Sequence, residues 1–327
     1  MKRQAFFGLI SMALVAIIIN LLSYNESFAK EKKVRIGYLQ SDLHQLAAFI
    51  ALEKGLYKKE GVNVVVGGVF KAGPEEMSAF ASGDLDFGYV GEAPATVAVV
   101  NKVADVKIIA QANLEGSAIV VYKGSGIKSL KDLVGKTVAV PGYATVQDFL
   151  MRKALNDNRI PVKTVNMIII KPPEMIPALR TNQIDAFVAW EPYPAKAIIS
   201  GVGEILVASG KIWPKHPCCV VVADTQFIEK NIEIIMGILR AHMKATNFIH
   251  ENPKEALEIG VKYTGMDIDS VKLAMRNIYY EYIPDTQGLL DYVTFLKELG
   301  QIKEIDPKDF VRNIIQRSFL EKISPKK

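Results

Sequence analysis

Side chains that could bind a small molecule gather in four short segments, each of which follows a predicted strand. These segments are residues 39–44, 91–96, 142–147 and 190–193. In open α/β sheets, ligands bind beyond the carboxyl ends of the strands, where helix N-termini present free N–H groups and a partial positive charge. The chemistry that these segments predict is the binding of a small molecule, for which helix N-termini suit an oxyanion.

The hydroxyl and aromatic side chains of these segments each allow two interpretations. Thr96 and Thr145 lie near predicted helix starts, where a hydroxyl either caps the helix or binds an oxyanion. Trp190, one of two tryptophans, either lines the cleft or packs in the core. The residues predicted to bind ligand are Tyr38, Gln40, His44, Gly91, Glu92, Ala93, Thr96, Tyr143, Ala144, Thr145, Trp190 and Glu191.

Two carboxylates complicate a simple anion site. Glu92 and Glu191 would repel a nitrate or a sulfonate unless each is turned away or pairs with a cationic part of the ligand. A helix-capping role for Glu92 and a surface role for Glu191 are the alternatives. The two residues therefore do not select a ligand.

The sequence offers no catalytic motif. The triplet 135–137, Gly-Lys-Thr, fails as a phosphate-binding loop because Leu130 stands where such a loop has glycine, and because the triplet opens a predicted strand rather than a helix. No Gly-x-Ser-x-Gly elbow and no nucleophile–base pair occurs. We therefore predict a protein that is not an enzyme and needs no cofactor.

The two cysteines, Cys218 and Cys219, are adjacent and cannot cross-link distant segments. Together with His216 they are too few and too crowded for tetrahedral zinc, so we interpret them as two buried thiols at the start of a strand. The other histidines, His44, His242 and His250, are scattered along the chain. The sequence alone predicts no metal site.

The elements that must position these segments are written twice, 99 residues apart. Each copy has an amphipathic helix, a Gly or Asn turn, a short apolar strand, and a loop with a carboxylate and a proline. The first copy contains Met77, Phe80, Gly83, Leu85, Asp86, Glu92 and Pro94, and the second contains Ile176, Leu179, Asn182, Ile184, Asp185 and Glu191, with Pro192 and Pro194 on either side of the last position.

Upstream of each copy, a strand, a helical stretch and a second strand recur. Strands that alternate with helices predict βαβ crossovers and largely parallel sheets. Two similar α/β units that face each other share one cleft, which predicts a clamshell that closes on a small molecule.

The N-terminus predicts export. Lys2 and Arg3 precede an apolar run, residues 5–22, and small residues precede Lys30, so we expect a signal peptide, 1–29, that is cut after Ala29; the alternative is an uncut membrane anchor. Removal of this segment lowers the net charge from +5 to +4, which is too mild for a nucleic-acid partner.

Several motifs in order resemble one transport family. They are Arg-Ile-Gly-Tyr at 35–38, Gly-Leu-Tyr-Lys-Lys-Glu-Gly at 55–61, Gly-Asp-Leu-Asp-Phe-Gly at 83–88, Asp-Leu-Val-Gly-Lys-Thr-Val-Ala at 132–139 and Trp-Glu-Pro at 190–192. Up to about Asp224, the mature chain resembles the nitrate/sulfonate/taurine-type solute-binding proteins of ABC importers.

The resemblance implies an α/β, two-lobed periplasmic-binding-protein type II fold with C-terminal helices packed on lobe I. Lobe I would comprise residues 30–121 and 217–327, and lobe II residues 122–216. We expect the hinge in the crossing strands, near residues 119–122 and 219–223. Apolar spacings of three and four predict helices at 225–250, 253–263, 268–280, 289–299 and 307–323.

By the same resemblance, the protein would be a periplasmic monomer that binds a small oxyanion, such as an aliphatic sulfonate, taurine or nitrate, and delivers it to an ABC permease and its ATPase. Three alternatives stay open: a binder of a heteroaromatic such as a thiamine-pyrimidine precursor, with Trp190 and tyrosines as stacking platforms; an enzyme on the same fold; and a sensor input domain.

Overall fold

The computed structural model describes residues 32–300, 302 and 305–323. The predicted signal peptide, 1–29, lies outside the described residues. Among those residues, no helix combines the length and the apolar character that crossing a bilayer requires.

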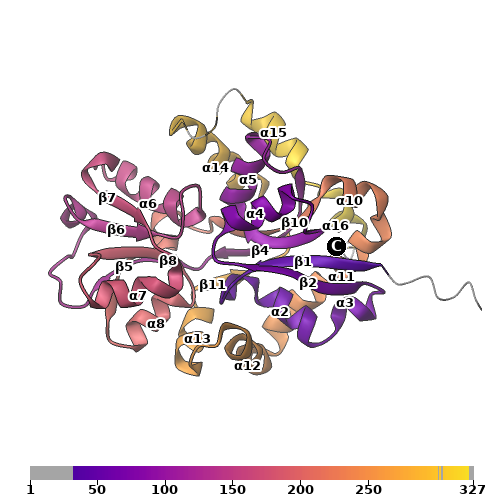
Figure 1. Ribbon diagram of the computed structural model, residues 1–327, viewed down its shortest axis with the longest axis horizontal. Helices are drawn as coiled ribbons and strands as arrows, with labels where there is room; N and C mark the ends of the chain where they lie inside the picture. Colours follow the sequence, from indigo (N-terminus) through magenta and orange to yellow (C-terminus); the bar gives the residue numbers. More distant parts are fainter. Residues whose placement is uncertain (1–31, 301, 303–304, 324–327) are drawn as a thin grey trace, which may run out of the picture. The chain divides into compact units, whose positions relative to one another are not determined.

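The first sheet has six strands in the order β11-β4-β10-β3-β1-β2. Strand β1 pairs with β3 in parallel, while β10 is antiparallel to both β3 and β4, and β11 is antiparallel to β4. Figure 1 shows helices α4 and α5 on one side of these strands and α2 and α3 on the other. The strands are β1 (Lys33–Leu39), β2 (Asn63–Phe70), β3 (Phe87–Gly91), β4 (Val106–Glu115), β10 (Pro217–Asp224) and β11 (Ile278–Tyr280); the helices that precede residue 101 are η2 (Leu43–Gln45), α2 (Leu46–Glu53), α3 (Leu56–Lys59), α4 (Gly73–Ala81) and α5 (Glu92–Val100).

The second sheet has five strands in the order β7-β6-β8-β5-β9, with β6 parallel to β7 and β8, and β5 antiparallel to β8 and β9. Both sheets are therefore mixed, and the expectation of largely parallel sheets was wrong, because β5 and β10 run against their neighbours. The strands are β5 (Ser117–Tyr122), β6 (Thr137–Val140), β7 (Asn166–Ile169), β8 (Ala186–Trp190) and β9 (Gly203–Ala208); the helices are η3 (Leu130–Leu133), α6 (Val146–Asp157), η4 (Val162–Thr164), α7 (Pro172–Arg180), α8 (Tyr193–Ile199) and α9 (Ser209–Ile212).

Strand β8 is buried on both faces, which explains its uninterrupted apolar sequence. Phe187 and Ala189 belong to the core cluster that includes residues of α7 and α8, while Ala186 and Val188 belong to the cluster that includes residues of α6. Successive side chains on a strand point to opposite faces, so a strand covered by helices on both sides reads as a continuous apolar run.

The C-terminal segment is helical, as expected, and its buried side chains belong to the same core cluster as the first sheet. Three details differ from the prediction: the helix expected at 225–250 is divided at Asn231, the helix expected at 307–323 is divided at residues 315–317, and residues 278–280 form β11 on the edge of the first sheet instead of ending a helix. The helices are α10 (Thr225–Lys230), α11 (Ile232–Glu251), α12 (Pro253–Thr264), α13 (Ile268–Met275), α14 (Thr286–Glu298), α15 (Pro307–Ile314) and α16 (Ser318–Ile323).

The chain passes between the sheets at two places. It leaves the first sheet at Gly116, between β4 and β5, and it returns through α9 and residues 213–216 to β10. The segments expected to form the hinge, 119–122 and 219–223, lie instead within the sheets, where they pair on both sides. The two places where the chain passes between the sheets, Gly116 and residues 209–216, therefore come just before the two predicted hinge segments in the sequence.

The duplicated aspartate has the same structural role in both copies. The carboxylate of Asp86 accepts from the backbone N–H of Arg35 at 2.7 Å, and that of Asp185 accepts from the N–H of Thr137 at 2.9 Å. Both aspartates thereby secure the first strand of their unit. Asp86 also binds the Arg35 guanidinium, with Nη2 2.8 Å from Oδ1.

Glu76 on α4 is a buried carboxyl in the core of the first unit. Its side chain is 0% exposed, and neither oxygen has a hydrogen-bond partner in the described part of the chain. Gly88 leaves room for the Glu76 side chain, because a Cβ atom added at residue 88 would lie only 2.4 Å from Oε1 of Glu76. Burial, reinforced by the charge of Asp42, raises the pKa of Glu76 well above its usual range.

We expect Asp86→Asn to lower the free energy of unfolding by about 2 kcal/mol, since it weakens hydrogen bonds that involve a charged pair. Asp185→Asn is the matched control, because Asp185 has the same role but its side chain is 37% exposed. Urea unfolding measures both variants. A loss at Asp185 as large as that at Asp86 would contradict this account.

We expect Glu76→Gln to flatten the dependence of stability on pH. The folded-state pKa of Glu76 is raised, so its contribution to stability is complete below the unfolded value of 4.5 and is lost as pH rises toward the folded pKa. From pH 5 upward, the free energy of unfolding of the variant should rise relative to that of the natural protein, by at most about 1.4 kcal/mol per pH unit. Parallel stability curves from pH 5 to 8 would refute this prediction.

Candidate functional site

A small cavity lies where the ends of both sheets meet. Its volume is about 10 Å³, room for about one water molecule. The first sheet and its helices contribute Leu39, Asp42, His44, Gly73, Gly91, Pro94, Cys218 and Cys219, and the second contributes Thr145, Val146, Gln147 and Trp190. Neither unit encloses the cavity by itself.

Four of the twelve residues predicted to bind ligand line this cavity: His44, Gly91, Thr145 and Trp190. The other eight lie outside its lining. They are Tyr38, Gln40, Glu92, Ala93, Thr96, Tyr143, Ala144 and Glu191.

The two tyrosines that were considered as stacking platforms are engaged elsewhere. Tyr38 is half-buried, with its ring edge-on to Phe49 at 5.4 Å between centroids. Tyr143 is 52% exposed, and its hydroxyl donates to the carbonyl of Met167 at 3.3 Å. Among the described residues, Trp190 is thus the aromatic side chain that lines the cavity.

Thr145 uses its hydroxyl to cap α6. The hydroxyl accepts from the backbone N–H of Asp148 at 3.2 Å and donates to the carbonyl of Gly142 at 2.7 Å. The capping interpretation therefore accounts for both bonds. The first turn of α6, where Val146 and Gln147 lie, faces the cavity with the partial positive charge of a helix N-terminus.

Trp190 carries a donor without a partner. The side chain is 3% exposed and packs edge-on to Tyr193, yet its indole Nε1 makes no hydrogen bond within the described residues. Buried indole N–H groups usually find an acceptor. Because the residue lines the cavity, a bound molecule could supply that acceptor.

Glu92 and Glu191 are both buried and neither lines the cavity. Burial, with a contribution from the charges of Asp285 and Cys218, raises the pKa of Glu92 well above its usual range, so this carboxyl resists ionisation. Burial also raises the pKa of Glu191 to about 6. Glu191 accepts from the N–H of Ala195 on α8 at 3.0 Å and from Nδ2 of Asn277 at 2.7 Å, so it caps a helix and ties it to the start of β11.

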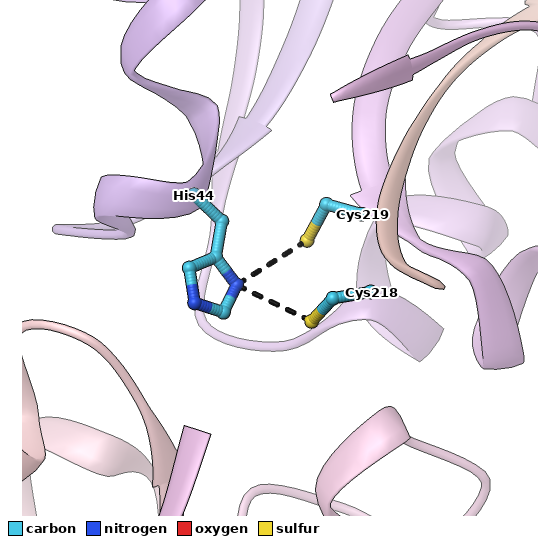
Figure 2. A group of neighbouring side chains, drawn as sticks. All are labelled: His44, Cys218 and Cys219. Atoms are coloured by element: carbon cyan, nitrogen blue, oxygen red, sulfur yellow. Dashed lines mark hydrogen bonds between the residues drawn. The ribbon is translucent and has the colours of Figure 1, made fainter. Parts of the chain in front are cut away.

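The structure adds a cluster that the sequence did not predict. Figure 2 shows His44 with its Nδ1 directed at both cysteines, at 3.3 Å from Sγ of Cys218 and 3.8 Å from Sγ of Cys219. Both thiols are buried, as predicted, and Asp42 lies beside them, with Oδ1 3.7 Å from Nδ1 of His44. No sequence signal connects these residues, because His44 and Cys218 are 174 positions apart.

The buried side chains of His44 and Cys218 shift each other's pKa. Burial alone would lower the pKa of His44, but Cys218 and Asp42 outweigh it and raise that pKa to about 9. Burial opposes ionisation of Cys218, while hydrogen bonding to Cys219 and the neighbouring His44 lower the pKa of its thiol below the usual range. A thiolate next to an imidazolium is the expected arrangement.

Comparison with known proteins gives several relatives along most of the chain. A Brucella abortus protein, named as a candidate binding protein, is 28% identical over 95% of this chain and 97% of its own length. The taurine-binding periplasmic protein of Escherichia coli is 26% identical over 79% of this chain and 85% of its own length. The crystal structure of the periplasmic nitrate-binding protein NrtA from Synechocystis has the same fold, with a TM-score of 0.80, 18% identity, and coverage of 90% of this chain and 88% of that one.

These similarities agree with the resemblance found in the sequence motifs, and the fold is that of periplasmic binding proteins. The model of the NMT1-like family matches residues 28–261, which is well over half of the chain. The chain belongs to the NMT1-like family.

Proposed function

We propose that the protein is the exported, solute-binding component of an ABC importer, and that it holds its solute in the cavity between the two sheets. The observation that carries this proposal is that both sheets contribute residues to the lining of the cavity and that neither sheet surrounds it alone. The relatives named for taurine and nitrate binding support it. A permease and its ATPase would be the partners, and the protein would act as a monomer.

We further propose a small oxyanion as the solute, such as taurine, another aliphatic sulfonate or nitrate. The free indole N–H of Trp190 and the first turn of α6 offer hydrogen-bond donors to an anion, and the imidazolium of His44 adds positive charge beside them. The raised pKa of Glu92 weakens the repulsion that its carboxylate would exert. A heteroaromatic solute is less well supported, because Tyr38 and Tyr143 do not line the cavity.

Entry of such a solute requires the units to separate, since the cavity has room for about one water molecule. Two ion pairs at or near the surface join the units, Lys171–Glu75 at 2.6 Å and Lys196–Asp267 at 2.7 Å. Such surface pairs contribute little stability, so they hold the units together only weakly. We propose that each sheet moves with its helices as one lobe, and that the hinge comprises Gly116 and residues 209–216.

Trp190→Phe should weaken solute binding about tenfold, because it removes one buried N–H donor and keeps an aromatic ring. Tyr57→Phe is the matched control, since it also removes one buried donor and keeps an aromatic ring, and Tyr57 bonds Tyr89 away from the cavity. Titration calorimetry with taurine, an alkanesulfonate and nitrate measures both variants. Equal affinities for the natural protein and Trp190→Phe would show that the indole N–H of Trp190 does not bind the solute.

Solute should also draw the two lobes together, because the closed state gains contacts only when the solute is present. Small-angle X-ray scattering should show a smaller radius of gyration on saturation. At about 100 times the dissociation constant, the fold should gain about 2.7 kcal/mol of stability. A solute proven to bind without compaction would rule out the clamshell.

A further inference from the structure

We propose that His44, Cys218 and Cys219, together with Asp42, form a binding site for one thiophilic metal ion of the zinc class. The ligand atoms of the two thiols and the imidazole all lie within 4.8 Å of one another. All four side chains are buried and all four line the cavity. This proposal does not depend on the transport role or on the identity of the solute.

The distances match tetrahedral coordination. Zn–S bonds of about 2.3 Å and Zn–N bonds of about 2.0 Å place sulfur and nitrogen ligands about 3.5 Å apart. The observed separations between Nδ1 of His44 and the two sulfur atoms are 3.3 and 3.8 Å, on either side of that value. An ion could therefore bind here with shifts of a few tenths of an ångström.

The backbone of β10 is irregular where the two cysteines lie. Neighbouring residues on a regular strand point to opposite faces, which would separate the two thiols. The pairing of β10 with β4 shifts register on both sides of Cys219, and such bulges re-aim side chains. Asn113 and Gln111 hold this bulge, since Asn113 accepts from the N–H of Cys219 at 3.0 Å and Gln111 donates to its carbonyl at 2.9 Å.

His44 is oriented as metal-binding histidines are. Its Nε2 lies 2.7 Å from the carbonyl oxygen of Gly116, which can only accept, so Nε2 carries a proton. Nδ1 is then the atom that faces the cysteines (Figure 2). Ligating histidines typically donate their other N–H to a carbonyl or carboxylate in this way.

Asp42 lies outside the group of three whose ligand atoms are all within 4.8 Å of one another, and a small shift of its carboxylate would make it the fourth ligand. Its Oδ1 lies 3.7 Å from Nδ1 of His44, and its Oδ2 lies 4.0 Å from Sγ of Cys219. The backbone N–H of His44 and the side-chain amide of Gln45 hold the carboxylate in place, at 2.9 and 3.2 Å. Each carboxylate oxygen has further lone pairs for an ion.

The ligand set selects the class of ion. Thiolate and imidazole ligands favour Zn²⁺ and related ions, whereas Mg²⁺ and Ca²⁺ require oxygen ligands. Binding would release the Nδ1 proton of His44 and the thiol proton of Cys219 to solvent. The cavity has room for about one water-sized occupant, and Trp190 and the start of α6 would close over the ion.

The test uses the reduced, metal-free mature protein, with two free thiols confirmed by titration, and Co²⁺ as the spectroscopic probe. We expect one Co²⁺ per chain, with thiolate-to-cobalt charge-transfer bands and the visible bands of tetrahedral cobalt, and full displacement by Zn²⁺ but not by Mg²⁺. Absence of these bands in the reduced protein would overturn the proposal.

Variants assign the ligands. Cys218→Ser, Cys219→Ser and His44→Ala should each weaken metal binding at least about 100-fold, because loss of an outer partner alone costs about 10- to 100-fold. Asp42→Asn should weaken it less and keep the charge-transfer bands. His250→Asn is the control, since this histidine bonds the carbonyl of Tyr280 outside the cavity. Unchanged stoichiometry and spectra in both serine variants would overturn the proposal.

A measurement on the unmodified protein guards against variants that do not fold. Alkylation of the cysteines with iodoacetamide should slow at least tenfold when Zn²⁺ is added, and should not respond to Mg²⁺. Equal rates with and without Zn²⁺ would refute the site. Solute titrations on metal-free protein are independent, so failure of taurine or nitrate to bind would leave this result unaffected.

Discussion

The backbone carbonyl of Gly116 is the acceptor on which the junction of the two sheets and the geometry of the cavity both depend. It accepts from the N–H of Glu191 at the end of β8, at 2.8 Å, and from Nε2 of His44, at 2.7 Å. The carbonyl of Glu191 in turn accepts from the N–H of Leu43 at 3.1 Å. A chain crossing, a strand end and the segment with His44 are thus connected through consecutive hydrogen bonds, so relative motion of the sheets must disturb the imidazole.

Glycine is required at this crossing for two reasons. Residue 116 has a φ of +85°, which side chains rarely tolerate, and an added Cβ would lie 2.4 Å from Nε2 of His44. The sequence shows a glycine at 116 but not why it is needed. The requirement becomes visible only when His44, 72 residues earlier, is placed against it.

The general architecture could be predicted because its signals are local and are written twice. Asp86 and Asp185 recur with the same spacing, and both accept the N–H of the first strand of their unit. Strand direction was harder to predict, since no local sequence pattern in β5 or β10 indicates that each runs antiparallel to its neighbours. The same limit applies to the hinge, whose position stays a prediction because it requires knowledge of which strand belongs to which sheet.

The candidate site could be predicted only in part, because its members come from distant segments. His44, Gly91, Thr145 and Trp190 were found from strand ends, where ligands bind in such folds. The sequence alone favours two buried thiols at Cys218 and Cys219, because the histidine that lies near them along the chain is His216. The fold instead places His44 against them, through a bulge that a periodicity of two cannot indicate.

Charge couples the two proposed occupants of the cavity. Without a metal ion, the imidazolium of His44 is the cationic side chain in the lining, next to the thiolate of Cys218 and the carboxyl of Asp42. A divalent ion would take the lone pair of Nδ1, two thiolates and a carboxylate, which leaves the occupied cluster with negative net charge. The ion would therefore remove the cation that an oxyanion could use and supply no net positive charge in return. Since coupling between two binding sites is reciprocal, whichever of the two binds first should weaken the other.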